Sequence, residues 1–306
     1  MEFFVLSVGG SMNPIRLFVE INTLCNYDCI FCYNSQCLQR QLSLQESFDL
    51  INSIPSVKFV DISGYGEILL HSNLQRILDK LSADKKQVSF STNGFALTPD
   101  KIDFLESSSL YILNVSLNSL NPQTYEYLTQ RNTLPQVLKN LDYLFSKKRK
   151  YRITISMVVT RYNIGELSEF VRYGKRKGTK IRFLSLSPNL TYSDDLRCED
   201  TPQNRLLLEN ANKLAKELGV RVDTFGFDEV HKSCSTEKKK NCRAPFEQFC
   251  IGSSGNVRPC CNLNMDMGNV FLTPWQEIWN NQKYQALRAS ITDGSLIFCQ
   301  NCKEFG

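Results

Sequence analysis

Short apolar runs alternate along the chain with segments in which apolar residues recur at helical spacing. The runs predict strands at residues 15–21, 57–62, 87–91, 111–117, 151–159 and 180–186. Helices are predicted at residues 42–53, 74–81, 121–145, 164–175 and 201–218, with a further one opened by Thr98 and Pro99. About six strand–helix units in succession indicate a parallel sheet with helices outside it.

Polar motifs directly follow four of the predicted strands. CNYDCIFC comes after the first strand, and GYGE, STNG and SLNS come at the ends of the next three. The carboxyl ends of parallel strands meet at one edge of the sheet, and barrel enzymes gather their chemistry there. The four motifs therefore predict one active site.

The strand–helix alternation stops after Leu218. A strand-like run at 220–225 leads into a polar, lysine-rich segment at 228–241, and the remaining chain is rich in cysteine. Within it, Gly255 and Asn256 mark a turn between two alternating runs, which predicts a hairpin of residues 246–251 and 256–261. We expect a first domain at 1–225, a linker at 226–241 and a small domain at 242–306.

Composition and charge limit the classes to which the chain can belong. With 306 residues, 42% of them hydrophobic, it can bury a core for a barrel-sized domain and an appendage. The net charge of +5 arises partly from basic clusters at 147–150, 175–180 and 238–240, and cations suit the C-termini of helices. A role as solvated charges at helix ends explains these clusters more simply than binding to nucleic acid does. An RNA-modifying enzyme with salt-sensitive RNA binding is the minority alternative.

Cysteine is abundant, with twelve residues in the chain, which would suggest disulfides in a secreted protein. The N-terminal residues MEFFVLSVGG, however, have no basic region and no long apolar core, and no stretch is apolar enough to span a membrane. We therefore expect a cytoplasmic protein with no membrane partner, whose cysteines serve as metal ligands in a reducing compartment.

The densest group of cysteines is Cys25, Cys29 and Cys32, in a C-x3-C-x2-C pattern. Three thiolates at this spacing cannot share one strand face or one helical stripe. They must therefore lie on a loop that wraps around a bound group. Soft sulfur ligands favour an iron–sulfur cluster or zinc. A structural zinc site normally closes with four protein ligands, whereas a cluster held by three cysteines leaves one iron open.

Together with Phe31, these cysteines resemble the signature C-x3-C-x-(aromatic)-C of the radical S-adenosylmethionine (SAM) enzymes. The resemblance implies an incomplete (β/α)6 TIM-type barrel, an α/β fold, with a [4Fe–4S] cluster whose open iron is chelated by SAM. It further implies that a flavodoxin- or ferredoxin-type reductant supplies an electron that cleaves SAM to a 5'-deoxyadenosyl radical. That radical takes a hydrogen atom from the substrate.

The resemblance extends to groups that contact SAM in this family. Gly66 and Glu67 of GYGE stand where the family's GGE motif binds the SAM ammonium group, although Tyr65 replaces the first glycine and Ile68 the proline that often follows. It also implies contacts with the SAM ribose, carboxylate or adenine for Phe31, Tyr33, Asn93, Ser116 and Asn118. Strand-end capping, turn formation and packing are the structural alternatives for these residues.

The C-terminal cysteines resemble the twitch module, a shortened relative of the SPASM auxiliary-cluster module. The resemblance implies a small C-terminal SPASM/twitch domain whose second [4Fe–4S] cluster is bound by Cys242, Cys260, Cys299 and Cys302. A four-cysteine zinc site is the alternative. Neighbours on a strand point to opposite faces, so we assign Cys260 as the ligand and leave Cys261, and Cys250 on the partner strand, outside the cluster.

A thiol near the site is either a buried small hydrophobe or a hydrogen-atom donor to the substrate radical. A donor would make the enzyme an epimerase, and Cys261, with Cys250 second, is the candidate. If the radical instead loses an electron to the auxiliary cluster, the product is an oxidised alcohol, as in the twitch-type dehydrogenases. Because Cys261 is left outside the predicted cluster, we favour epimerisation slightly, with the dehydrogenase as the alternative.

The substrate class is predicted only by a negative observation. Only 24 residues precede Cys25, so no N-terminal peptide-recognition domain is expected, which favours a sugar, an aminoglycoside-like compound or another small molecule over a peptide. A peptide substrate stays open as the alternative, because some peptide epimerases of the family lack such a domain. A molybdopterin-pathway GTP cyclase is disfavoured, because its C-terminal glycine pair and second cysteine spacing are absent. A non-catalytic cluster- or zinc-binding protein is the competing class.

Overall fold

The computed structural model describes residues 13–34, 38–186, 195–225 and 242–296. The strands are β1 (Arg16–Val19), β2 (Phe59–Ile62), β3 (Gln87–Thr92), β4 (Leu110–Ser116), β5 (Arg152–Val159), β6 (Lys180–Ser185), β7 (Val222–Phe225), β8 (Gln248–Ile251), β9 (Asn256–Arg258) and β10 (Gly268–Asn269). The helices are α1 (Leu44–Ser53), α2 (Leu74–Ala83), α3 (Pro99–Ser107), α4 (Pro122–Thr129), α5 (Leu134–Ser146), α6 (Leu167–Lys177), α7 (Pro202–Leu218), α8 (Ala244–Glu247), α9 (Trp275–Trp279) and α10 (Gln282–Thr292), with 3-10 turns η2 (Ile68–Leu70) and η3 (Ile164–Glu166).

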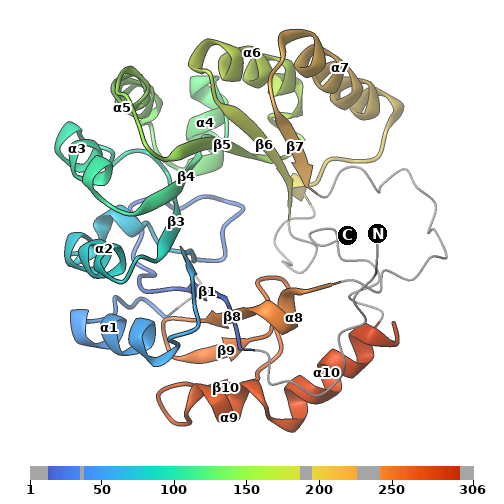
Figure 1. Ribbon diagram of the computed structural model, residues 1–306. Helices are drawn as coiled ribbons and strands as arrows, with labels where there is room; N and C mark the ends of the chain where they lie inside the picture. Colours follow the sequence, from blue (N-terminus) through green and yellow to red (C-terminus); the bar gives the residue numbers. More distant parts are fainter. Residues whose placement is uncertain (1–12, 35–37, 187–194, 226–241, 297–306) are drawn as a thin grey trace, which may run out of the picture.

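All ten strands belong to one sheet, in the order β10-β9-β8-β1-β2-β3-β4-β5-β6-β7. From β8 to β7 each neighbouring pair is parallel, whereas β9 and β10 are antiparallel. The sheet curls with α1 to α7 on its outside (Figure 1). This α/β arrangement is the incomplete TIM-type barrel that the alternation and the cysteine signature predict.

Two strands extend the six that the alternation predicts. β7, formed by the strand-like run at 220–225 that follows the end of the alternation, pairs in parallel with β6. β8, from the cysteine-rich region, pairs in parallel with β1, where Phe18 lies opposite Cys250 and the Glu20 N–H donates to the Ile251 carbonyl at 2.9 Å. The C-terminal region therefore continues the barrel sheet at its β1 edge.

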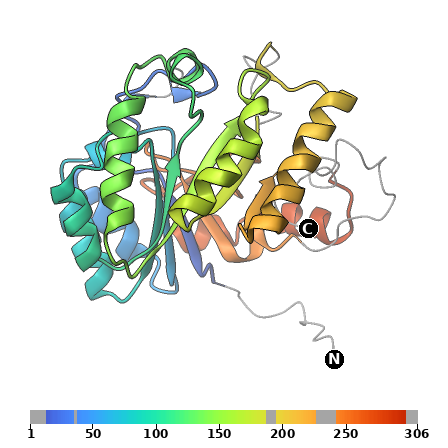
Figure 2. The same cartoon turned by 90° about the horizontal axis from the view of Figure 1, so that it is seen from above.

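The main core lies between the sheet and the outer helices. On β1, Leu17 and Val19 are buried while Arg16 and Phe18 are half-buried, and β2 shows the same alternation. The green-to-gold helices α5, α6 and α7 lie side by side in front of the strands (Figure 2). Apolar burial against these helices fixes which side chains of each strand face the barrel interior.

A second, aromatic core joins the C-terminal helices to the sheet. The Phe249 ring on β8 is fully buried and stacks on the Tyr284 ring at a centroid distance of 6.4 Å and an angle of 10°. The rings of Trp275 and Trp279 contact it from α9. The predicted hairpin is confirmed, with Gly255 at φ +82° in the turn between β8 and β9.

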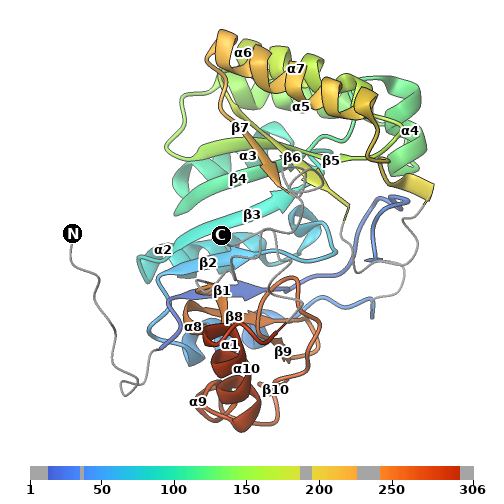
Figure 3. The same cartoon turned by 90° about the vertical axis from the view of Figure 1, so that its right-hand side faces the viewer.

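The strands β1 to β6 point the same way, and the loop after β1 lies beyond their carboxyl ends (Figure 3). The cysteine motif and the three further polar motifs are thereby brought to the same end of the barrel. No helix within the described ranges combines the length and apolarity that a membrane crossing requires.

Candidate active site

The cysteine loop is closed at its base by a short antiparallel pairing. The Thr23 N–H donates to the Arg40 carbonyl at 2.8 Å, and the Leu42 N–H donates to the Ile21 carbonyl at 2.8 Å. The buried Thr23 hydroxyl also donates to the Leu38 carbonyl at 2.6 Å and accepts the Arg40 N–H at 2.7 Å. The chain therefore leaves and rejoins the barrel at one point above β1.

The connection between α4 and α5 supports the same loop from the side. The Arg131 guanidinium donates to the Asn26 carbonyl at 2.9 Å and to the Asp28 carboxylate at 2.6 Å. The Tyr27 ring is buried beside Tyr125, and their hydroxyl groups are 3.0 Å apart. These contacts fix the backbone on which the three cysteines stand.

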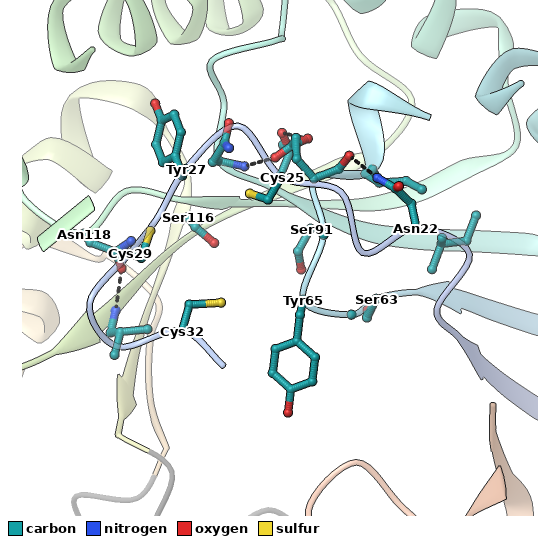
Figure 4. Close-up of a pocket in the computed structure, with 18 of the residues that line it drawn as sticks. Asn22, Cys25, Tyr27, Cys29, Cys32, Ser63, Tyr65, Ser91, Ser116 and Asn118 are labelled. Atoms are coloured by element: carbon teal, nitrogen blue, oxygen red, sulfur yellow. Dashed lines mark hydrogen bonds between the residues drawn. The ribbon is translucent and has the colours of Figure 1, made fainter. Parts of the chain in front are cut away.

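A pocket of about 190 Å³ lies at the carboxyl ends of β1 to β5. Nine of the residues predicted for the site line it, namely Cys25, Cys29, Phe31, Cys32, Gly66, Glu67, Asn93, Ser116 and Asn118. The three cysteines surround the same space as Ser91, Ser116 and Tyr65 (Figure 4). Tyr33 packs on the Tyr65 ring at a centroid distance of 5.7 Å. The motifs at four strand ends thus form one site, as predicted.

The two glycines of GYGE allow the loop to pack against the end of β1. A β-carbon on Gly66 would lie 2.2 Å from the Asn22 carbonyl oxygen, and one on Gly64 would lie 2.3 Å from Oε1 of Glu20. The Asn22 side chain also donates to the Glu67 carbonyl at 2.9 Å. The replacement of the first glycine of the family motif by Tyr65 is compatible with this packing, because Tyr65 lines the pocket.

Glu67 is the buried centre of the loops after β2 and β3. Its carboxylate accepts the Thr92 hydroxyl at 2.7 Å, the Asn93 N–H at 2.7 Å and the Leu69 N–H at 3.0 Å. Burial raises the pKa of the Glu67 carboxyl, and these hydrogen bonds oppose that rise. Glu67 therefore holds the pocket wall together, and its contact with the SAM ammonium group stays a prediction.

Asn93 and Asn118 also make internal contacts at the pocket wall. The Asn93 side chain donates to Oδ1 of Asn26 in the cysteine loop at 2.8 Å and accepts the Phe95 N–H at 3.0 Å. The Asn118 side chain accepts the Val158 N–H at 3.0 Å. These are the turn and capping interactions weighed as the structural alternative, and the SAM contacts of both residues stay predictions.

The thiols of Cys25 and Cys29 hold their protons more tightly than a free cysteine does. Burial raises the pKa of the Cys25 thiol to about 11, and burial followed by the neighbouring thiols raises that of Cys29. Metal loading must therefore displace protons from these sulfurs. Within the described ranges no group of three or more His, Cys, Asp or Glu side chains is arranged as the ligands of a metal ion. The fit to a cluster rests on three soft donors sharing one pocket with polar groups.

The predicted auxiliary-cluster ligands are only partly described. Cys242 and Cys260 are half-buried, while Cys299 and Cys302 lie outside the described residues. The expectation that Cys260 and Cys261 stand on a strand is wrong, because β9 ends at Arg258. Cys261 is nevertheless exposed, whereas Sγ of Cys260 accepts the Leu263 N–H at 3.3 Å. The assignment of these four ligands stays a prediction.

The two thiols predicted as hydrogen donors stand apart from the pocket lining. Cys250 is buried on β8, with an exposed fraction of 3%, and Cys261 is exposed beyond β9. Neither is among the residues that line the pocket.

Several residues of the site escaped the sequence analysis. Asn22, Tyr27, Ser63 and Thr92 line the pocket, and Glu20, the residue after β1, supports it. Thr92 could have been found beside Asn93 in the STNG motif. Tyr27 lies inside CNYDCIFC and Ser63 directly precedes GYGE, so the same motifs could have indicated them. Asn22 and Glu20 act through contacts between distant segments, which no local pattern reports.

Two comparisons of the sequence identify the class. The family model described as the radical SAM superfamily matches residues 19–174, just over half of the chain. A second model, described as an iron–sulfur cluster-binding domain and called SPASM, matches residues 242–303. The chain therefore belongs to the radical SAM superfamily. Its cofactors are SAM, a SAM-binding [4Fe–4S] cluster and an auxiliary iron–sulfur cluster.

Individual relatives refine this picture. Mycofactocin maturase MftC of Mycolicibacterium smegmatis is 30% identical over 180 residues, which cover 58% of this chain and 45% of that protein. GTP 3',8-cyclase of Synechocystis is 31% identical over 188 residues, which cover 59% and 56%. The chain thus spans about half the length of these curated relatives.

The fold is shared with a solved structure over nearly the whole chain. SuiB of Streptococcus suis bound to SAM has a TM-score of 0.75 at 18% identity, covering 95% of this chain and 72% of SuiB. A second SuiB structure is bound to the precursor peptide SuiA and covers 91% of this chain.

Proposed function

We propose that this enzyme abstracts a hydrogen atom from a carbon of a peptide substrate. The observation that carries the chemistry is the pocket in which Cys25, Cys29 and Cys32 meet polar groups from the ends of β2, β3 and β4. When bound there, SAM and its cluster supply a 5'-deoxyadenosyl radical. The chain's own residues orient SAM and decide which hydrogen is reached.

The peptide class is supported by the similarity to SuiB, whose structure with a precursor peptide has a TM-score of 0.75. We prefer it to the small-molecule class favoured by the sequence, for which GTP 3',8-cyclase is the relative named above. The likeness to GTP 3',8-cyclase is confined to 59% of the chain, so it supports the shared SAM chemistry more than a shared substrate.

For the second half of the reaction, we propose epimerisation through a thiol. The substrate radical takes the hydrogen of a Cys S–H group from its opposite face, which inverts the carbon and leaves a thiyl radical. One electron from a low-potential reductant and one proton then restore the thiol. Cys261 is the proposed donor because it is exposed, whereas Cys250 is only 3% exposed, and buried cysteines commonly act as small hydrophobes.

The test uses cluster-loaded protein, a chemical reductant, SAM, and candidate peptides and aminoglycosides in D2O. The proposal expects 5'-deoxyadenosine formation stimulated by a peptide, and one deuterium at an inverted carbon of that peptide. Cys261→Ala should still form 5'-deoxyadenosine but give no epimer, while the matched variant Cys250→Ala should still give it.

Different results separate the alternatives. Stimulation by aminoglycosides alone would restore the small-molecule class. A product two mass units lighter, without deuterium, would indicate oxidation through the auxiliary cluster. An unchanged epimer yield in Cys261→Ala would exclude Cys261 as the donor.

A further inference from the structure

A half-buried carboxylate, that of Glu20, lies between the SAM pocket and the C-terminal region. Its Oε1 accepts the Tyr65 N–H at 2.9 Å, and its Oε2 accepts the Ser253 N–H at 3.3 Å. Tyr65 belongs to the GYGE loop and lines the pocket, whereas Ser253 lies in the turn between β8 and β9. One side chain thus holds two loops that are far apart in the sequence.

The packing around Glu20 leaves this carboxylate little freedom. Gly64 is in such close contact that a β-carbon there would lie 2.3 Å from Oε1. Ser253 is only 5% exposed, and the Glu20 backbone N–H is itself bonded to the Ile251 carbonyl at 2.9 Å. The carboxylate therefore cannot swing away without moving the GYGE loop or the β8–β9 turn.

Glu20 also lies beside the pocket that the cysteine loop lines, because Tyr65, whose N–H it accepts, belongs to the same lining as Cys32. A negative charge beside a bound cluster disfavours the addition of an electron, so the Glu20 carboxylate would lower the reduction potential of a cluster held in this pocket.

We propose that Glu20 is a positioning residue that couples the SAM pocket to the auxiliary-cluster region. Binding of SAM orders the GYGE loop, and the Glu20 carboxylate transmits this order to the β8–β9 turn. Hydrogen bonds from N–H groups to a carboxylate are about twice as strong as neutral ones, which suits this coupling role. The inference needs SAM binding at the cysteine pocket, and it does not depend on the substrate class proposed above.

The test is hydrogen–deuterium exchange, followed by mass spectrometry, on cluster-loaded protein with and without SAM. In the natural protein, SAM should slow exchange both at residues 64–66 and at 252–254. In Glu20→Gln, whose amide has a single acceptor oxygen, exchange at 252–254 should rise on the order of tenfold and no longer respond to SAM. SAM binding is measured separately from the absorption spectrum.

Glu166→Gln is the matched control. The Glu166 carboxylate is also half-buried and accepts two backbone N–H groups, those of Leu120 at 2.7 Å and Asn121 at 3.3 Å. This variant should raise exchange at 120–121 and leave the SAM response at 252–254 intact.

A redox titration followed by electron paramagnetic resonance adds a readout that a purely structural role would not move. The midpoint potential of the SAM-site cluster should rise in Glu20→Gln, stay unchanged in Glu166→Gln, and stay nearly unchanged in Glu20→Asp, which keeps the charge but has a shorter reach. The coupling is overturned if SAM binds to the natural protein without changing hydrogen exchange at 252–254. It is also overturned if SAM changes that exchange equally in Glu20→Gln. Loss of SAM binding in the natural protein would instead overturn the cofactor site itself.

Discussion

Gly66 shows how closely single residues of the pocket are fitted to their surroundings. The atoms that a β-carbon would meet are the Asn22 carbonyl oxygen at 2.2 Å and the Thr23 Cα at 2.8 Å. Both are backbone atoms, and Thr23 is held in the pairing that closes the cysteine loop. The glycine is therefore required by close backbone approach, independently of any contact that it makes with SAM.

Replacing Gly66 by alanine should lower the free energy of unfolding by about 1–3 kcal/mol, because the GYGE loop must shift away from β1. The shift should also weaken SAM binding. Gly165→Ala is the matched control, since a β-carbon at Gly165 meets nothing within 4 Å. Denaturant unfolding and SAM titration of both variants check this, and equal behaviour of the two would contradict the packing argument.

At the scale of elements, His71 joins the 3-10 turn η2, which follows GYGE, to the base of the cysteine loop. Its Nε2 lies 3.1 Å from the Leu42 carbonyl oxygen, and its Nδ1 accepts the Asn73 N–H at 3.1 Å. An acceptor at Nδ1 and a carbonyl facing Nε2 require the neutral ring with its hydrogen on Nε2. Burial lowers the pKa of His71 below that of a free histidine side chain, in agreement with this state.

The lowered pKa predicts a loss of stability on acidification. As the pH falls, His71 takes up a proton in the unfolded chain before it does so in the folded chain. Its contribution to the free energy of unfolding is therefore complete above about pH 6.5 and is lost as the pH falls toward the folded-state pKa. The free energy of unfolding of the apo protein is measured with denaturant between about pH 7.5 and about pH 5. It should decline less for His71→Gln than for the natural chain. Parallel declines would show that His71 does not titrate in this way.

At the scale of the whole molecule, the C-terminal region is part of the barrel sheet as well as the site of the predicted auxiliary cluster. β8 pairs with β1 through one edge, and Phe249 on the same strand packs into the aromatic core of α9 and α10. A change in that core should therefore reach β1, which leads directly into the cysteine loop.

Phe249→Ala should lower the free energy of unfolding by about 3–5 kcal/mol, because the ring is fully buried. Leu272→Ala is the control, since Leu272 is 84% exposed and its loss should cost less than about 0.5 kcal/mol. Hydrogen exchange should show β1 losing protection together with β8 in Phe249→Ala. Unchanged protection of β1 would mean that the two regions are stable independently.

The sequence predicted what local patterns encode and missed what depends on distant pairing. The strands, the helices and the cysteine pocket follow from periodicity and from motifs at strand ends, and the structure contains them. The pairing of β8 with β1 and the contacts of Glu20 join segments that are distant along the chain, so no local pattern reports them. The strand expected at Cys260 and Cys261 ends at Arg258, directly before Pro259, which has no backbone N–H to donate to a strand ladder.

The central claim is that Cys25, Cys29 and Cys32 hold a cluster with an open iron at which SAM is cleaved. Its most direct test is the 5'-deoxyadenosine released by anaerobically reconstituted protein on addition of SAM and a strong reductant, measured for the natural chain and for Cys29→Ala. We predict that the natural chain releases the nucleoside and that Cys29→Ala releases none while keeping the auxiliary-cluster spectrum. No nucleoside from the natural chain, or equal amounts from both proteins, would contradict the account.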